Sequence, residues 1–192
     1  MDKSIPYADV LMRREKGTPI PTVALPEGFS FVYYRAGDEH AWARITADVD
    51  EFPSAADALL RFREEFMPFA SDLEGRCLFI ENAEHLKIAT ATAWWCHTGA
   101  RRDPLLHWVA VIPPYQGRGL GKAIVSRAVH RLLELEGDHD FYLHTQTWSY
   151  KAIGIYEKMG YAISNEQGVG GRANHQYDKA LEILRSVRRN SG

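Results

Sequence analysis

The sequence predicts a mixed α/β domain whose central sheet is mainly antiparallel, with helices on both faces. Three strand patterns, at residues 77–80, 87–95 and 105–112, follow one another with little sequence between them, which is typical of an antiparallel meander. Helix, strand and helix patterns then alternate over residues 120–159, which adds the α/β part of the fold. The hydrophobic fraction of 45% supplies enough apolar side chains for a real core.

The composition indicates one domain of ordinary size and argues against several functional classes. The 192 residues carry 23 basic and 25 acidic side chains, and this balance gives no electrostatic case for binding nucleic acid. No apolar run approaches the roughly 20 residues that cross a bilayer. The N-terminus lacks a signal-peptide pattern, so we expect a cytoplasmic protein without membrane or nucleic acid partners. Cys77 and Cys96 are expected to be free thiols.

The N-terminal 28 residues hold four of the nine prolines. Between these prolines lies a short charged piece, from Arg13 to Lys16. We therefore expect residues 1–28 to form a proline-rich arm that packs on a single domain made of residues 29–192.

The first half of that domain reads as one strand and two helices. Residues 29–35 are rich in aromatic and β-branched side chains, as strands are. Asp38 can cap a helix that runs to about Asp48. A second helix restarts at Pro53-Ser54 and should end at Pro68. Its apolar positions at helical spacing are Ala58, Leu59, Phe62 and Phe66.

The second half begins with the three strand patterns of the meander, and helices and strands follow. We expect a helix at 120–136, a strand at 141–147, a helix at 150–159 and a short strand at 161–163. A glycine-containing loop, expected to be flexible, leads to a final helix at 177–187. The apolar positions of this helix are Ala180, Leu181, Leu184 and Val187.

The segment from Val109 to Lys122 carries the strongest functional signal. A buried strand ends at a proline pair, a loop follows with glycine at alternate positions, and a helix then opens. Glycines let backbone N–H groups approach a ligand closely, and a helix N-terminus adds unpaired donors, so this arrangement suits phosphate groups. The segment does not match the dinucleotide-binding fingerprint, because Lys122 stands where the third glycine is required. It does not match the P-loop either, because Gln116 replaces the first glycine and Ala123 replaces the serine or threonine.

What remains is Q-x-x-G-x-G on a strand, loop and helix, and this segment resembles the acyl-CoA-binding motif of the Gcn5-related N-acetyltransferases. The resemblance implies the acyl-CoA N-acyltransferase fold, with a sheet that splays at the cofactor site, and acetyl-CoA as cosubstrate. In that family the loop amides bind the pyrophosphate and the preceding strand binds the pantetheine. By similarity, the cofactor-binding residues are Val109, Val111, Gln116, Gly117, Arg118, Gly119, Leu120, Gly121, Lys122 and Ser149.

A second segment, residues 149–161, supports the resemblance. It is similar to the family pattern N-x-x-A-x-x-x-Y-x-K-x-G-F, with Ser149 in place of the asparagine and Tyr161 in place of the phenylalanine. Ala152 and Tyr156 lie four residues apart, hence on one helix face. The resemblance gives Tyr156 the role of general acid toward the leaving thiolate. The close resemblance covers about 57 of the 192 residues.

The proton acceptor is the second catalytic residue that the sequence predicts. On a regular strand Leu105, His107, Val109 and Val111 would share one face, so His107 would point the same way as the cofactor-facing valines. Histidine is suited to proton transfer near neutral pH. A strand histidine occupies the matching position in arylalkylamine acetyltransferases. A structural strand histidine is the alternative reading, and the amide of Val109 is a candidate oxyanion donor.

The sequence leaves the acceptor open. We expect an N-acetyltransferase that transfers an acetyl group from acetyl-CoA to a primary amine of a small molecule by direct attack. The alternatives are a protein lysine or N-terminal acetyltransferase and a non-catalytic acyl-CoA-binding sensor. His85 and His97 have no partners at metal-ligand spacing, so no metal is expected. The tryptophans are expected to pack in the core more often than to line an acceptor pocket. The region after Ile163 could form a homodimer contact.

Overall fold

The structure is a computed structural model that describes residues 1–190. Its strands are β1 (Asp9–Arg14), β2 (Phe29–Tyr33), β3 (Cys77–Asn82), β4 (Lys87–Thr98), β5 (Arg101–Val111), β6 (Phe141–Gln146) and β7 (Ala162–Ile163). Its α-helices are α1 (Glu39–Asp48), α2 (Ala55–Phe66), α3 (Ala70–Leu73), α4 (Leu120–Glu136), α5 (Tyr150–Lys158) and α6 (Tyr177–Asn190).

The strands of the described residues pair in the order β2-β3-β4-β5-β6-β1-β7. The pairs β2–β3, β3–β4, β1–β6 and β1–β7 are antiparallel, whereas β5 runs parallel to β6 at Leu105 and Tyr142. This mixed, mainly antiparallel sheet confirms the predicted fold class.

The chain divides into two compact units. The central unit contains residues 22–94 and 106–131, and the terminal unit contains residues 1–21, 95–105 and those from 132 onward. Each of β4 and β5 therefore has one part in each unit. The single domain expected for residues 29–192 stays a prediction.

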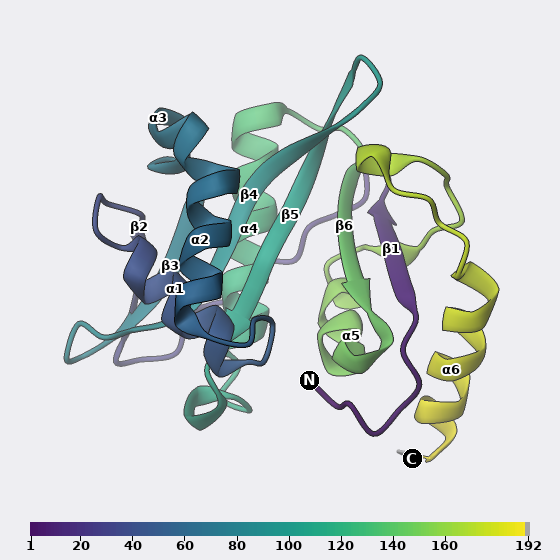
Figure 1. Cartoon of the computed structure of the whole chain (residues 1–192), viewed down its shortest axis with the longest axis horizontal. Coiled ribbons are helices and arrows are strands. Elements are labelled where there is room, and N and C mark those ends of the chain that lie inside the picture. The colour runs from purple at the N-terminus through teal and green to yellow at the C-terminus, as the bar shows by residue number, and fades with distance from the viewer. Residues whose placement is uncertain (191–192) are drawn as a thin grey trace. The chain divides into compact units, whose positions relative to one another are not determined.

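The central unit is built on β2, β3 and the parts of β4 and β5 that belong to it. Its antiparallel register pairs Phe31 with Ile80 and Phe79 with Thr90. Residues 88–94 of β4 are all buried, because α1 and α2 cover one face of these strands and α4 covers the other (Figure 1). A strand buried on both faces needs no alternation of polar and apolar residues, and the small residues of β4 fit this position.

The two helices α1 and α2 begin at the expected places but differ in how they are capped. Ser54 accepts a hydrogen bond from the Asp57 backbone N–H at 3.2 Å, which stabilises the first turn of α2. Asp38 precedes α1 but gives it no side-chain cap. Its carboxylate instead accepts from the Arg35 backbone N–H at 2.9 Å and pairs with Lys87 at 3.0 Å. The side chain that was expected to cap α1 therefore joins its N-terminus to β4.

The terminal unit contains a strand that the sequence did not predict. Residues 9–14, inside the expected proline-rich arm, form β1 between β6 and β7. Val10, Leu11 and Met12 are buried in succession, so β1 lacks the alternation that marks a half-exposed strand. The two arginines at the end of β1 are not typical of a buried strand. They are accommodated because Arg13 pairs with Asp140 at 2.7 Å and Arg14 with Asp138 at 3.2 Å.

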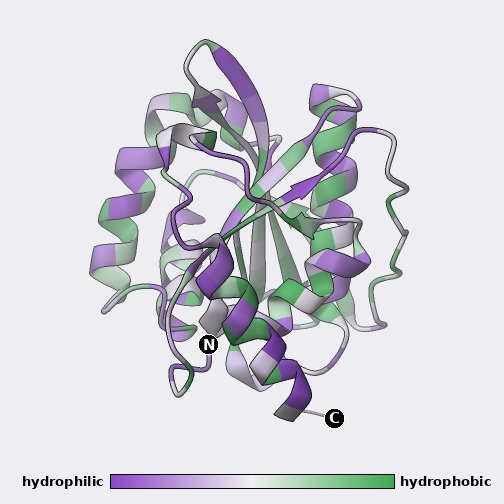
Figure 2. Cartoon of the chain, turned by 90° about the vertical axis from the view of Figure 1, so that its right-hand side faces the viewer, coloured by the Kyte–Doolittle hydropathy of each residue, from purple (hydrophilic) through white to green (hydrophobic). Residues whose placement is uncertain are grey.

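The C-terminal segment of the terminal unit confirms the expected final helix and extends it. The helix α6 starts at Tyr177, as predicted, and runs on to Asn190. Its buried residues Ala180 and Leu184 form a narrow apolar stripe on a mainly hydrophilic helix (Figure 2), and α6 packs on β1. The preceding loop is anchored, because the Gly170 N–H donates to Thr98 Oγ1 at 3.0 Å and Val169 is fully buried.

Residues 1–8 hold the junction between β6 and α5 in place. Thr147, fully buried, accepts a hydrogen bond from the Ala8 N–H at 2.9 Å and donates to the Pro6 carbonyl at 2.6 Å. The Trp148 indole N–H donates to the Ile5 carbonyl at 2.8 Å. The N-terminal segment therefore fixes the turn that leads into α5.

Replacement of Thr147 by valine should lower the free energy of unfolding by roughly 1–3 kcal/mol, because the N–H of the buried Ala8 and the carbonyl of Pro6 lose their partner. Urea denaturation monitored by tryptophan fluorescence measures this change. Thr145→Val is the matched control, since Thr145 lies on β6 and its side chain makes no hydrogen bond to any other described residue. Equal stabilities for the two variants would contradict the proposed role of Thr147.

Candidate active site

The loop from β5 to α4 presents a row of unpaired backbone donors. Gly117 and Gly119 have φ values of 78° and 85°, in the left-handed region that favours glycine. Within the described residues, the backbone N–H groups of residues 117–121 donate to no other residue. They lie at the N-terminus of α4, whose dipole adds positive partial charge. This geometry suits a phosphate or pyrophosphate group.

Tyr115 fixes the loop to the strands of the central unit. Its hydroxyl accepts a hydrogen bond from Asn82 Nδ2 at 2.9 Å, and its ring packs edge-on against Phe29 at 6.1 Å. The guanidinium of Arg118 lies 5.0 Å from the centre of the same ring. Gln116, expected to bind the cofactor, uses its side-chain amide to donate to the Val111 carbonyl at 2.8 Å. The Gln116 side chain therefore shapes the loop.

The strand β5 has a kink at Trp108. Its φ of 47° is left-handed, which is rare for a bulky residue and interrupts the regular strand. Consecutive strand residues normally point to opposite faces. Here His107 Nε2 lies 2.5 Å from Glu65 Oε1, and Trp108 Nε1 donates to Glu65 Oε2 at 3.2 Å. The expectation that His107 and the cofactor-facing valines share one face relied on regular alternation along the strand. In β5 this alternation is interrupted at Trp108.

The carboxylate of Glu65 is the partly buried charge of this region. Arg61, one turn earlier on α2, contacts Glu65 Oε2 through its Nε at 2.9 Å. Burial acts to raise the pKa of Glu65, but the hydrogen bond and charge of His107 outweigh it, with help from Arg61 and Trp108, so the pKa is lowered. Glu65 is therefore an ionised carboxylate at neutral pH.

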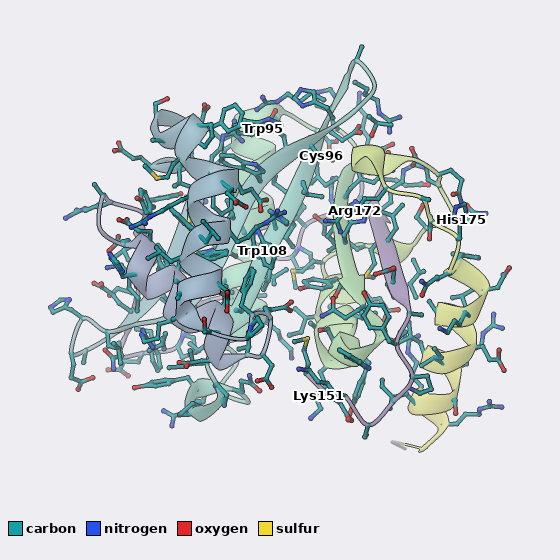
Figure 3. The ribbon with its side chains drawn as sticks, viewed as in Figure 1. Trp95, Cys96, Trp108, Lys151, Arg172 and His175 are labelled. Atoms are coloured by element: carbon teal, nitrogen blue, oxygen red, sulfur yellow. The ribbon has the colours of Figure 1, made fainter. Side chains whose placement is uncertain are left out.

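Aromatic rings surround this carboxylate within the central unit. The Trp108 side chain (Figure 3) lies with its ring centre 5.2 Å from that of Phe52 and 5.5 Å from that of Trp42. Phe62 and Phe66, on the same helix as Glu65, are fully buried against Trp42. These rings fix the position of α2 and hence of the Glu65 side chain.

Tyr156 and Ser149 belong to the terminal unit. Tyr156, on α5, is 6% exposed, and its ring centre lies 6.4 Å from that of Tyr161. Ser149 immediately precedes α5, and its hydroxyl accepts a hydrogen bond from Gln146 Nε2 at 3.3 Å. The β6–α5 junction thus carries the serine that the sequence motif assigns to the cofactor.

Comparison with known proteins places this geometry in a family. The model of the acetyltransferase (GNAT) family matches residues 39–161, which include the glycine loop, Glu65, His107 and Tyr156. The chain belongs to the GNAT acetyltransferase family. The matched range also contains all of the predicted site residues.

Two relatives and one solved structure illustrate the GNAT assignment. A mycothiol acetyltransferase from Salinispora arenicola is 31% identical over 156 residues, which cover 79% of this chain and 50% of that protein. The spermidine N(1)-acetyltransferase of Vibrio cholerae is 28% identical over 41% of this chain and 46% of that protein. The crystal structure of a GCN5-related N-acetyltransferase from Sphaerobacter thermophilus has a TM-score of 0.63 at 19% identity, covering 83% of this chain and 49% of that one. The chain thus spans about half the length of these relatives.

The structure divides the predicted GNAT site residues between the two units. His107, Val109, Val111 and residues 116–122 lie in the central unit, whereas Ser149 and Tyr156 lie in the terminal unit. Glu65 and Tyr115 are not among the site residues that the sequence predicts. Tyr115 could have been noticed because it lies next to Gln116 in the loop motif. No local pattern indicates that Glu65, on a helix, contacts His107, on a strand 42 positions later.

The described residues contain no group of three or more His, Cys, Asp or Glu side chains that could hold a metal ion. None of their helices combines the length and the apolar character needed to cross a membrane.

The hydroxyl of Tyr161 should be dispensable for stability. Tyr161 is 3% exposed, its Oη has no hydrogen-bond partner among the described residues, and burial strongly raises its pKa. Tyr161→Phe should therefore raise the free energy of unfolding by about 1 kcal/mol, since it removes an unsatisfied buried group. Tyr142→Phe is the matched control, because Tyr142 donates to Glu166 at 3.0 Å and its loss should destabilise. Urea denaturation that ranks Tyr161→Phe below the wild type would contradict this account.

Proposed function

We propose that this protein transfers an acetyl group from acetyl-CoA to a primary amine of a small molecule. The observation that carries the proposal is the row of unpaired N–H groups at residues 117–121, at the N-terminus of α4. Such a row fits a pyrophosphate, and the exposed side chains of Arg118 and Lys122 add positive charge beside it. Because the chain belongs to the GNAT family, we take acetyl-CoA as the ligand whose pyrophosphate binds there.

The remaining cofactor contacts follow from the family motif. By the family motif, the backbone of β5 at Val109 and Val111 is proposed to bind the pantetheine, and Ser149 is proposed as a further cofactor-binding residue. The Val111 carbonyl accepts from the Gln116 side chain, and the Val111 N–H is the proposed contact to the pantetheine. Acetyl-CoA supplies an activated thioester, and the protein supplies position and proton transfer.

Proton transfer is needed because the acceptor is mostly charged in solution. An alkyl amine with a pKa near 10 is only about one part in a thousand neutral at pH 7, and the neutral form is the nucleophile. We assign His107 as the group that takes the amine proton and Tyr156 as the group that protonates the sulfur. The new N–C bond forms as the C–S bond breaks. The Val109 amide is the proposed donor to the carbonyl oxygen as it becomes negative.

A small-molecule acceptor is supported by the names of the relatives, a mycothiol acetyltransferase and a spermidine acetyltransferase. The partly exposed rings of Phe52 and Trp108 in the central unit are also compatible with an ammonium ion, which aromatic faces attract. A peptide substrate finds no comparable support in these contacts.

The deciding experiment is isothermal titration of the protein with acetyl-CoA, followed by a thiol-release assay over a panel of small amines and a lysine-containing peptide. Micromolar binding with thiol release on a small amine would support the proposal. Release on the peptide alone would favour a protein acetyltransferase, and binding without any release would favour an acyl-CoA sensor. Absence of binding would overturn the assignment of the loop.

Gly117→Ala should raise the dissociation constant of acetyl-CoA at least about tenfold, equivalent to ~1.4 kcal/mol, since alanine disfavours the φ that aims the loop amides. Gly17→Ala is the matched control, because Gly17 has a φ of 79° against 78° for Gly117 and an equally open Cβ position. Both variants should lose similar stability. Unchanged acetyl-CoA affinity in Gly117→Ala would contradict the proposed pyrophosphate site.

Tyr156→Phe should lower turnover at least about tenfold and leave acetyl-CoA affinity nearly unchanged, because only the proton donor to the leaving sulfur is removed. Steady-state thiol release and isothermal titration measure the two quantities. Tyr142→Phe, the loss of a hydroxyl elsewhere in the terminal unit, controls for general effects on the fold. Full turnover in Tyr156→Phe would exclude this tyrosine from the chemistry.

A further inference from the structure

The contact between α2 and β5 determines which nitrogen of His107 can accept a proton. The Glu65 carboxylate, ionised at neutral pH, can only accept hydrogen bonds. His107 Nε2, 2.5 Å from Glu65 Oε1, must therefore carry a hydrogen. A neutral imidazole has one N–H and one lone-pair nitrogen, so the lone pair of neutral His107 is on Nδ1.

We propose that Glu65 is a positioning residue that holds His107 in the Nε2–H form and so presents Nδ1 as the proton acceptor for the amine. The inference rests on the proposed acetyl transfer and adds to it the residue that orients the base. Nδ1 makes no hydrogen bond to any described residue, so it is available to an amine or a bridging water.

The other contacts of Glu65 fit an orienting role better than a role in binding substrate. Oε1 is engaged by His107, and Oε2 accepts from Trp108 at 3.2 Å and contacts Arg61 at 2.9 Å. Three donors already occupy this carboxylate. Its side chain is 17% exposed, as is that of His107, so the pair is shielded from solvent and its geometry is confined.

The surroundings restrict both partners. Phe62 and Phe66 bury the adjacent turns of α2, which fixes the helix on either side of Glu65. The His107 ring centre lies 4.9 Å from that of Trp108 and 6.3 Å from that of Phe66. The ring of His107 is therefore held by packing, and the carboxylate selects which of its nitrogens carries the proton.

A purely structural role is the competing explanation, because Glu65 also holds the Trp108 indole at the kink of β5. Trp108→Phe separates the two, since it keeps an aromatic side chain at the kink and removes the indole N–H that donates to Glu65. If Glu65 acts through His107, Trp108→Phe should change turnover by less than about threefold. A loss in Trp108→Phe as large as that in Glu65→Gln would assign Glu65 to the kink and overturn the proposal.

The kinetic test compares Glu65→Gln with Glu64→Gln in the full chain. Glu64 precedes Glu65 on α2, is exposed, and its side chain makes no hydrogen bond or ion pair with another described residue, so the same change of charge there is the matched control. Glu65→Gln should lower kcat by at least about tenfold, but by no more than the roughly 10²–10⁴-fold that loss of the base itself would cause. The KM for the amine should change less than about twofold. Equal kinetics for the two variants in an active enzyme would overturn the positioning role.

A double-mutant cycle tests whether Glu65 acts through His107. In the His107→Gln background, Glu65→Gln should cost less than about threefold, because the residue it positions is already gone. Multiplicative losses would mean that Glu65 acts independently of His107, which would overturn the proposal. Thermal melting of all variants excludes loss of fold as the cause.

Nitrogen NMR of the ¹⁵N-histidine-labelled protein reads the His107 tautomer without any need for activity. With the signals assigned by their loss in His107→Gln, the wild type at alkaline pH should show a protonated Nε2 and an unprotonated Nδ1. In Glu65→Gln this preference should weaken or reverse. A protonated Nδ1 in the wild type would overturn the inference.

If no amine is acetylated, the proposed function fails, and the positioning role fails with it. The NMR result would still report the tautomer.

Discussion

The contact on which the central unit depends is the carboxylate of Glu65 between α2 and the kink of β5. A left-handed φ at a tryptophan is unfavourable by itself and persists only where its surroundings hold it. Three features hold Trp108: its indole donates to Glu65, its ring lies edge-on to Trp42, and Phe52 packs against it. Because the kink turns consecutive residues toward one carboxylate, the same contact also sets the orientation of His107.

The glycine loop depends on a different constraint, the need to leave backbone donors unpaired. Buried N–H groups without partners are costly, but residues 117–119 lie in an exposed loop, where water or an anion can pair with their N–H groups, and Leu120 and Gly121 open α4. Tyr115 and Gln116 hold the loop through side-chain contacts to Asn82 and to the Val111 carbonyl, so its amides are free for a ligand. The loop is thus ordered by side chains and keeps its backbone available.

The sequence predicted most of the fold because the elements that carry it have strong local patterns. The helix at 120–136 matches α4 at both ends, and the final helix begins at Tyr177 as expected. β1 was missed because it is buried in succession and ends in two arginines, whose partners Asp138 and Asp140 are remote in sequence. The family was predictable from the glycine loop, since spacing alone defines that motif, and the family match confirms it. The roles of the individual site residues remain predictions.

Glu65 shows why the rest of the site was not predictable. On α2 it occupies the position between Phe62 and Phe66 and, by spacing, pairs with Arg61 as many solvent-exposed glutamates do. Only the kink at Trp108 brings two donors of β5 to that carboxylate, and the kink arises at a bulky residue that no turn rule singles out. A pattern of period two also gave the wrong expectation for the strand itself, because one left-handed residue ends the alternation. The residues most sensitive to tertiary contacts are therefore those at which chemistry is proposed, and strand periodicity is least reliable there.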